Sequence, residues 1–286
     1  MIIGKDAFKK IKALALDLDG TALLPDTTMG ERTVKALKEL MARGIQVFFC
    51  TGRAIEAVER YRTAIGAEGP MVYFNGAEVV DMPAAHILKA TLLELEVVEF
   101  CIDISRSMDI HFQIFLPPGI IEGKDKWEAL VVDKPRPEAE MYRNHTGIIP
   151  VVQNLKTAIS RPGLKGCVKS MFICEPALHD EIRKRLAERF GNMIYVARTF
   201  PSFIEIMNAG VSKGDGLKIA MEYRGLSAAA VLALGDEEND LLMFDAAGLS
   251  AAPANARENV RTRADFVFGS NSEEGIASFL EENFLR

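Results

Sequence analysis

The sequence lacks a long hydrophobic run, a CxxC pair, and the motifs GxxxxGK, GxSxG, HExxH and GxGxxG. Its longest apolar stretch lies within residues 226–234, far short of the roughly 18 residues that a membrane span needs. The N-terminal segment, MIIGKDAFKK, contains no long apolar part, so we expect no secretory signal and no membrane partner.

The chain also has no excess of basic over acidic residues. The chain has 34 Lys and Arg against 40 Asp and Glu, a net charge of −6. An acidic surface does not attract phosphate backbones, so we expect no nucleic-acid partner. Without a CxxC pair, we expect buried reduced thiols in a cytoplasmic protein rather than disulfides or a zinc site. The thiols in question are Cys50, Cys101, Cys167 and Cys174.

Short apolar stretches alternate with helical patterns at both ends of the 286-residue chain, which is long enough for one large domain or two modest ones. Residues 12–17, 45–50 and 229–234 are predicted strands with nearly continuous apolar sequence. Such strands, separated by helices, are typical of a doubly wound parallel sheet. Asn75-Gly76, between two apolar runs, predicts a hairpin.

The first helix is expected from about Met29, because Thr28 and Glu31 have the spacing of a capping box. After Pro83 the pattern changes to closely spaced strands, which suits a smaller α+β unit with an antiparallel sheet. The parallel pattern resumes near Val211. We therefore predict an α/β protein whose Rossmann-like core is discontinuous and contains an inserted α+β domain. The core would comprise residues 1–83 and 207–286, and the inserted domain residues 84–206.

Four polar clusters follow core strands or open a core helix: DLDGT at 17–21, TGR at 51–53, Lys213, and GDEEND at 235–240. Taken singly, each is explained by a polar strand end, a solvated lysine or an acidic turn. In an open α/β sheet, however, ligands bind outside the carboxyl ends of the strands. We therefore expect the four clusters to converge on one site.

Convergence would bring the carboxylates of Asp17, Asp19 and Asp236 together, and like charges repel unless something neutralises them. A hard cation such as Mg²⁺, which prefers a few carboxylates and substrate phosphate, would do so. Lys213, the Thr51 hydroxyl and nearby backbone amides would add positive charge and donors for a tetrahedral dianion. One carboxylate could then act as nucleophile and another as acid and base.

The order LALDLDGT, CTGR, FNGA, VSKGDGL and LALGDEENDLLMF resembles the haloacid dehalogenase (HAD) superfamily, most of all its Cof-type phosphatases with a type IIB cap. The resemblance covers nearly the whole chain. It implies that the inserted domain is a cap that selects the substrate. It further implies Mg²⁺-dependent hydrolysis of small phosphorylated metabolites, such as sugar phosphates, through an aspartyl-phosphate.

The resemblance also implies residue roles. Asp17 matches the nucleophile and a metal ligand, and Asp19 matches the acid/base and binds metal through its carbonyl. Asp236 matches a further Mg²⁺ ligand, and Asp240 a carboxylate that orients the site. Phosphate contacts are implied for Leu18, Thr51, Gly52, Lys213 and Asn239, and possible substrate contacts for Arg53, Asn75 and Lys169.

Other functions share parts of this pattern. A phosphomutase or a specialised sugar-phosphate phosphatase of the same superfamily would carry the same core motifs. A DxD glycosyltransferase would not need Lys213 or GDEEND at strand ends. A regulator that only binds phosphate would not need the acid/base Asp19. The sequence does not decide the oligomeric state.

Overall fold

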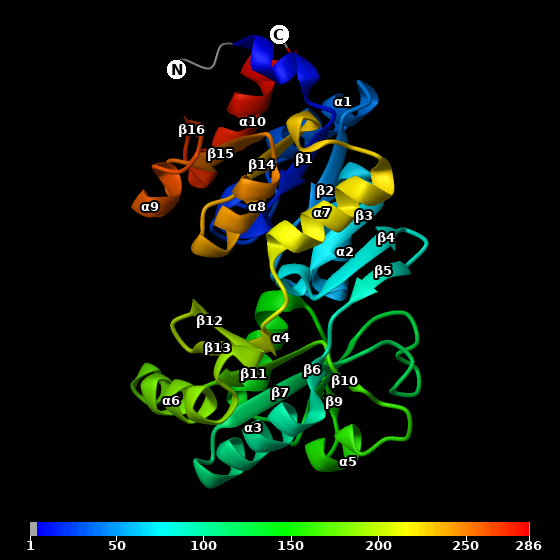
Figure 1. Ribbon diagram of the computed structural model, residues 1–286, viewed down its shortest axis with the longest axis vertical. Helices are drawn as coiled ribbons and strands as arrows, with labels where there is room; N and C mark the ends of the chain where they lie inside the picture. The colour runs from blue at the N-terminus through cyan, green and yellow to red at the C-terminus, as the bar shows by residue number, and fades with distance from the viewer. Residues whose placement is uncertain (1–4, 286) are drawn as a thin grey trace. The chain divides into compact units, whose positions relative to one another are not determined.

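The structure is a computed structural model that describes residues 5–285 (Figure 1). The described chain forms two compact units. The first unit contains the residues up to 53, residues 58–89 and the residues from 212 onward. The second unit contains residues 54–57 and 90–211.

The first unit is built on a five-stranded parallel sheet. β1 lies between β14 and β2, so that Ala13 is paired with both Val231 and Gln46. β1 and β14 are buried along their whole length, which explains their uninterrupted apolar sequences ALAL and VLAL. The predicted α/β fold class is confirmed. The strand order is β16 (Phe266–Phe268), β15 (Leu249–Pro253), β14 (Val231–Leu234), β1 (Ala13–Leu16) and β2 (Gln46–Phe49).

Helices cover this sheet on both faces. Alternate strand residues such as Ala15, Phe48 and Ala233 pack against α7, α8 and α9 in one apolar cluster. The intervening residues, among them Leu14 and Phe49, are also fully buried, and α1 packs against β2 and α10. The helices are α1 (Glu31–Ala42), α2 (Ile55–Ile65), α7 (Lys213–Arg224), α8 (Leu241–Ala246), α9 (Glu258–Arg261) and α10 (Gly275–Leu280). Short helical turns occupy Lys5–Lys10, Leu18–Ala22, Phe74–Gly76, Ala228–Ala230, Glu238–Asp240, Asn271–Glu273 and Glu281–Leu285.

The start of α1 differs from the prediction. α1 begins at Glu31 with Gly30 as its N-cap, and glycine has no side chain to cap it. The carboxylate of Glu274 instead accepts a hydrogen bond from the backbone N of Thr33 at 2.8 Å. The hydroxyl of Thr28 donates to Asp26 Oδ1 at 2.6 Å. The predicted capping box was wrong because the cap comes from a residue far away in the sequence.

The predicted hairpin is confirmed. β3 (Gly69–Tyr73) and β4 (Glu78–Met82) are antiparallel, and β5 (His86–Ala90) completes a three-stranded sheet. The connecting turn holds Phe74, Asn75 and Gly76 at φ values of 48°, 55° and 95°.

The second unit contains a six-stranded sheet in the order β12-β13-β11-β7-β8-β9. Neighbours are antiparallel as expected, except that β8 and β9 are parallel. The strands are β7 (His111–Leu116), β8 (Ala129–Val132), β9 (Val151–Val152), β11 (Lys169–Ile173), β12 (Ile194–Phe200) and β13 (Phe203–Asn208). A small pair joins β6 (Leu93–Glu94) to β10 (Gly166–Cys167). The helices are α3 (Leu95–Ser107), α4 (Pro137–Thr146), α5 (Leu155–Ile159) and α6 (His179–Phe190), with short turns at Pro176–Leu178 and Gly191–Met193.

All four cysteines are buried and free. Among residues 5–285, no helix has both the length and the hydrophobicity needed to cross a membrane.

Candidate functional site

The ends of neighbouring core strands bring polar residues to one edge of the sheet. Asp17 follows β1 directly, and its backbone N donates to Leu234 O of β14 at 2.9 Å. Asp236 lies two residues beyond the end of β14. Lys213 is the first residue of α7, and the Ser212 side chain caps that helix by accepting from the backbone N of residue 215. The edge predicted from the sequence is therefore formed.

Lys213 is the centre of a buried charge network. Its Nζ donates to Asp17 Oδ1 at 2.5 Å and to Asp240 Oδ1 at 2.7 Å. The other oxygen of Asp240 accepts from the backbone N of Asp236 at 2.9 Å and of Glu237 at 3.0 Å. Both oxygens of Asp240 are thus engaged in hydrogen bonds, and its orienting role stays a prediction.

A cluster of carboxylates surrounds this lysine. Asp17, Asp236 and Asp240 each place one oxygen within 4.8 Å of the others, and all three residues are buried. Asp236 is further held by the Thr21 hydroxyl, which donates to its Oδ1 at 2.9 Å. Hard oxygen donors of this kind fit a divalent cation such as Mg²⁺. From the sequence we expected the side chain of Asp19 to be the third carboxylate of this cluster. In the structure the third carboxylate is that of Asp240.

The charges in this cluster do not balance. Burial raises the pKa of Asp17 well above its usual range; Lys213 opposes this, and repulsion from Asp240 and Asp236 adds to it. Burial, followed by repulsion from Asp240, raises the pKa of Asp236 to about 7. Burial lowers the pKa of Lys213, but Asp17 and Asp240 raise it by more. One ammonium thus faces three carboxylates, and a further positive charge would stabilise their ionised forms.

Asp19 points to a different partner. Its two carboxylate oxygens accept from Arg53 Nε at 2.7 Å and Nη2 at 2.6 Å, which makes a bidentate ion pair. The Arg53 side chain is buried, while that of Asp19 is 45% exposed. The Asp19 carboxylate is therefore accessible and lies outside the carboxylate cluster.

The Thr51 segment and the hairpin turn lie side by side. Thr51 is fully buried and accepts on its backbone O from the backbone N of Asn75 at 2.9 Å. A Cβ on Gly52 would lie 3.1 Å from the side-chain oxygen of Asn75. That oxygen also accepts from Asn239 Nδ2 at 3.0 Å. Three residues predicted for phosphate or substrate contact are thus brought together with Gly52.

Two asparagines that the sequence analysis missed hold the loop after Asp17. Asn255 Nδ2 donates to Gly20 O at 2.8 Å, and Asn271 Nδ2 donates to Leu23 O at 2.8 Å. The two are linked, because Asn255 Oδ1 accepts from the backbone N of Asn271 at 2.9 Å. Leu18, at the start of this loop, is fully buried. Asparagines in surface loops are common, and no spacing rule could have singled these out.

Lys169 lies in the second unit, on β11. It is fully buried, and its Nζ donates to Glu205 Oε1 at 2.8 Å and lies 5.3 Å from the ring centre of Phe115. Its role as a substrate contact stays a prediction.

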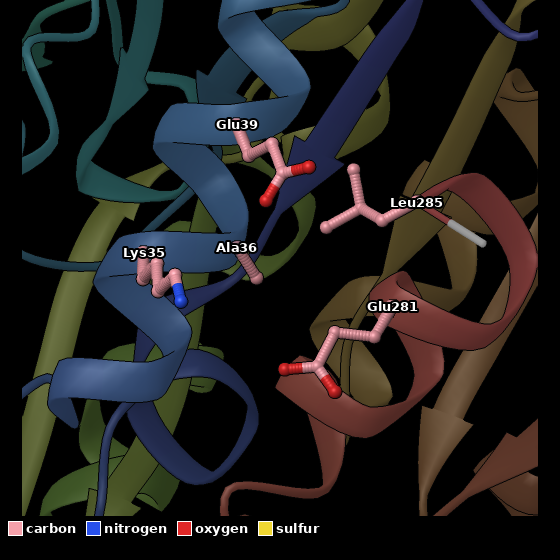
Figure 2. Close-up of a pocket in the computed structure, with 5 residues that line it drawn as sticks. All are labelled: Lys35, Ala36, Glu39, Glu281 and Leu285. Atoms are coloured by element: carbon pink, nitrogen blue, oxygen red, sulfur yellow. The ribbon is translucent and has the colours of Figure 1, made fainter.

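A surface hollow of about 270 Å³ lies between α1 and the C-terminal helical turn (Figure 2). One lysine and two glutamates contribute opposite charges to it, and none of the residues predicted for the site lines it. The lining residues are Lys35, Ala36, Glu39, Glu281 and Leu285. The carboxylate cluster therefore remains the candidate site.

Comparison with known proteins identifies the class. A family model of the haloacid dehalogenase-like hydrolases matches residues 14–280, and the chain belongs to that family. The predicted Cof-type relationship and the predicted enzyme class, a phosphatase, are confirmed.

Individual relatives match over nearly the whole chain. The 5-amino-6-(5-phospho-D-ribitylamino)uracil phosphatase YitU of Bacillus subtilis is 29% identical over 282 residues, 95% of this chain and 97% of that protein. The pyridoxal phosphate phosphatase YbhA of Escherichia coli is 26% identical over 291 residues, 96% of this chain and 99% of that protein. A crystal structure of a haloacid dehalogenase-like hydrolase from Bacteroides thetaiotaomicron has a TM-score of 0.85 at 24% identity, covering 96% of this chain and 100% of that chain.

Proposed function

We propose that this protein is a Mg²⁺-dependent phosphatase that hydrolyses small phosphorylated metabolites through an aspartyl-phosphate on Asp17. The observation that carries the proposal is the buried cluster of Asp17, Asp236 and Asp240 around Lys213. A site with excess buried negative charge favours a cation, and its single lysine is placed beside the candidate nucleophile.

The donor set fits Mg²⁺. The side chains of Asp17 and Asp236 and the backbone carbonyl of Asp19 would hold the ion, with Asp240 orienting the site. When bound, Mg²⁺ would neutralise the carboxylates and the negative charge of the phosphate. The raised pKa of Asp236 supports this assignment, because a nearby cation would favour the ionised carboxylate.

Two aspartates would share the chemistry. The carboxylate of Asp17 would attack the phosphorus while the bond to the leaving oxygen breaks and Asp19 gives that oxygen a proton. Asp19 would then take a proton from water as the water attacks the phosphorus and frees Asp17. Lys213, 2.5 Å from Asp17, holds the nucleophile and places positive charge where the phosphate oxygens would lie. Thr51 and the amides of Leu18 and Gly52 would complete the phosphate contacts.

The names of two relatives support a proposal for the substrate class. Two of them are named for small phosphorylated metabolites, a ribitylaminouracil phosphate and pyridoxal phosphate. We infer a substrate of this kind, with residues 1–83 and 207–286 as the catalytic core and residues 84–206 as a substrate-selecting cap. Arg53 and Lys169 are candidate substrate contacts. Because the four thiols are buried and free, we also place the protein in the cytoplasm.

A panel of phosphorylated metabolites, assayed for phosphate release with Mg²⁺ and with excess chelator, tests the proposal. We expect turnover of at least one small substrate with Mg²⁺, and loss of that turnover in chelator and in Asp17→Asn. Full activity in chelator would exclude the metal role. Transfer of phosphate to a sugar acceptor, without release, would indicate a phosphomutase instead.

A further inference from the structure

The hairpin turn at residues 74–76 has a strained backbone. Phe74 and Asn75 have φ values of 48° and 55°, in the left-handed region, which a bulky residue such as phenylalanine rarely adopts and which asparagine tolerates better. Such strain persists only where the surroundings enforce it, and it concentrates at functional sites.

Contacts with two of the predicted motifs hold this turn in place. The backbone N of Asn75 donates to Thr51 O at 2.9 Å, and that of Phe74 donates to Arg53 O at 3.2 Å. On the other side, a Cβ on Gly76 would lie only 2.0 Å from Ser212 O, next to Lys213. The turn is thus fixed between the TGR segment and the start of α7.

The fixed turn leaves one polar group without a partner. Asn75 is 2% exposed, and its Oδ1 accepts from Asn239 Nδ2 at 3.0 Å. Its Nδ2 is buried and has no hydrogen-bond partner among the residues that the structure describes. An unmade hydrogen bond from a buried donor is costly, which suggests that a bound acceptor completes it. The neighbouring side chain, Asn239, is left with a free acceptor oxygen, which an anion would not approach.

We propose that Asn75 Nδ2 donates to the bound phosphate and that Asn239 is a positioning residue which turns this donor toward it. The inference rests on the proposed phosphatase function and refines it. The resemblance assigned the phosphate contact to Asn239, but one N–H of its amide already donates to Asn75 Oδ1, whereas Asn75 Nδ2 has neither of its hydrogens engaged among the residues that the structure describes. The roles of the two asparagines would therefore be divided, with Asn75 in direct contact and Asn239 acting through it.

Two substitutions of Asn75 remove the side-chain donor while keeping the backbone conformation of the turn. Asn75→Gly removes the donor and suits a positive φ, and Asn75→Asp keeps the shape while replacing the donor with an acceptor. Binding of inorganic phosphate to the Mg²⁺-loaded protein would be measured by calorimetry. We expect both variants to bind phosphate about 10- to 150-fold more weakly, the range for a lost hydrogen bond to a charged group. Asn283→Asp, which removes a partly buried donor to Phe279 O, serves as the control with unchanged binding.

A double-mutant cycle tests the role of Asn239. We expect Asn239→Ala alone to weaken phosphate binding less than Asn75→Gly, and to add nothing in the Asn75→Gly background. Wild-type phosphate affinity in a folded Asn75→Gly or Asn75→Asp protein would overturn the inference. So would an Asn239→Ala effect that persists in full in the double variant. If the wild type binds no phosphate and cleaves no phosphate ester, the proposed function itself fails and the inference falls with it.

Discussion

Gly20 and Asp236 lie so close together that a Cβ on residue 20 would fall 2.1 Å from Asp236 Oδ2. Gly20 also has a φ of 75°, in the left-handed region. The glycine of DLDGT therefore has a steric role beyond turn formation, because any side chain there would displace a carboxylate that we assign to the metal site.

Gly20→Ala should lower kcat/KM by about 10²-fold, the cost of a roughly 1 Å misplacement in an active site. Gly44→Ala is the matched control, since Gly44 has a φ of 86° but a Cβ there would meet nothing within 4 Å. Both variants should lose roughly 1–2 kcal/mol of stability from the backbone alone. Only Gly20→Ala should also weaken Mg²⁺ binding, measured by calorimetry. Equal activity of the two variants would contradict the steric role.

Lys213→Met should lower the free energy of unfolding by about 3–5 kcal/mol in chelator at neutral pH, because it leaves Asp17 and Asp240 buried without their shared cation. Urea unfolding measures this change. The control is Lys218→Met on the same helix, whose side chain is 63% exposed and pairs with Asp215 at 3.0 Å. An exposed pair contributes at most about 1 kcal/mol, so the control should change little. A similar loss in both variants would show that the charge network adds no stability.

Much of the core was predictable because its signals are local. β1 and β14 are covered on both faces, so each is a short run of continuous apolar residues with an aspartate close behind it. The parallel sheet then requires these aspartates to meet at one edge. The family resemblance added roles that the pattern alone left open.

The features that were missed depend on contacts between distant parts of the chain. The cap of α1 is Glu274, 241 residues from Thr33. The side chain of Asp19 could not be placed without knowing that Arg53 lies beside it. Nor does any local pattern distinguish Asn255 from an ordinary loop asparagine. In each case the partner is set by tertiary structure.

The stability of the metal-free protein should fall as pH rises from about 4 to 7. Asp236 has a pKa of about 7 in the folded protein, against about 3.9 when unfolded. The folded state therefore binds more protons across this window, which makes unfolding easier at higher pH. Asp17, whose pKa is also raised by burial, should act in the same direction.

Chemical unfolding in chelator, at pH values from about 4.5 to about 8 that bracket this window, checks the prediction. The comparison is with Asp236→Asn, which keeps every other titrating group, including His111, whose pKa is lowered by burial. The pH-dependent loss should be smaller in the variant, and saturating Mg²⁺ should reduce it in the wild type. Parallel curves for the two proteins in chelator would show that Asp236 has an ordinary pKa.

Asp17→Asn and Asp19→Asn should impair catalysis at different steps. Asp17→Asn removes the proposed nucleophile and one proposed metal ligand charge, so no phosphoenzyme should form with any substrate. Asp19→Asn keeps the nucleophile and the backbone carbonyl but cannot donate a proton. Because general acid–base catalysis contributes about 10²–10⁴-fold, its loss should be large for an alkyl phosphate. An aryl phosphate should suffer less, since its phenolate leaves with little protonation.

The guanidinium of Arg53 donates to both carboxylate oxygens of Asp19, at 2.7 and 2.6 Å. In Asp19→Asn the side-chain amide oxygen still accepts one of these hydrogen bonds. The loop should therefore keep its place while only the proton is lost. The measurement is acid-quench trapping of the phosphoenzyme, with mass spectrometry to map the modified residue, alongside steady-state rates for both substrates. Phosphate on residue 19, wild-type turnover by Asp17→Asn, or equal rate losses of Asp19→Asn for both leaving groups would each reverse the assignment.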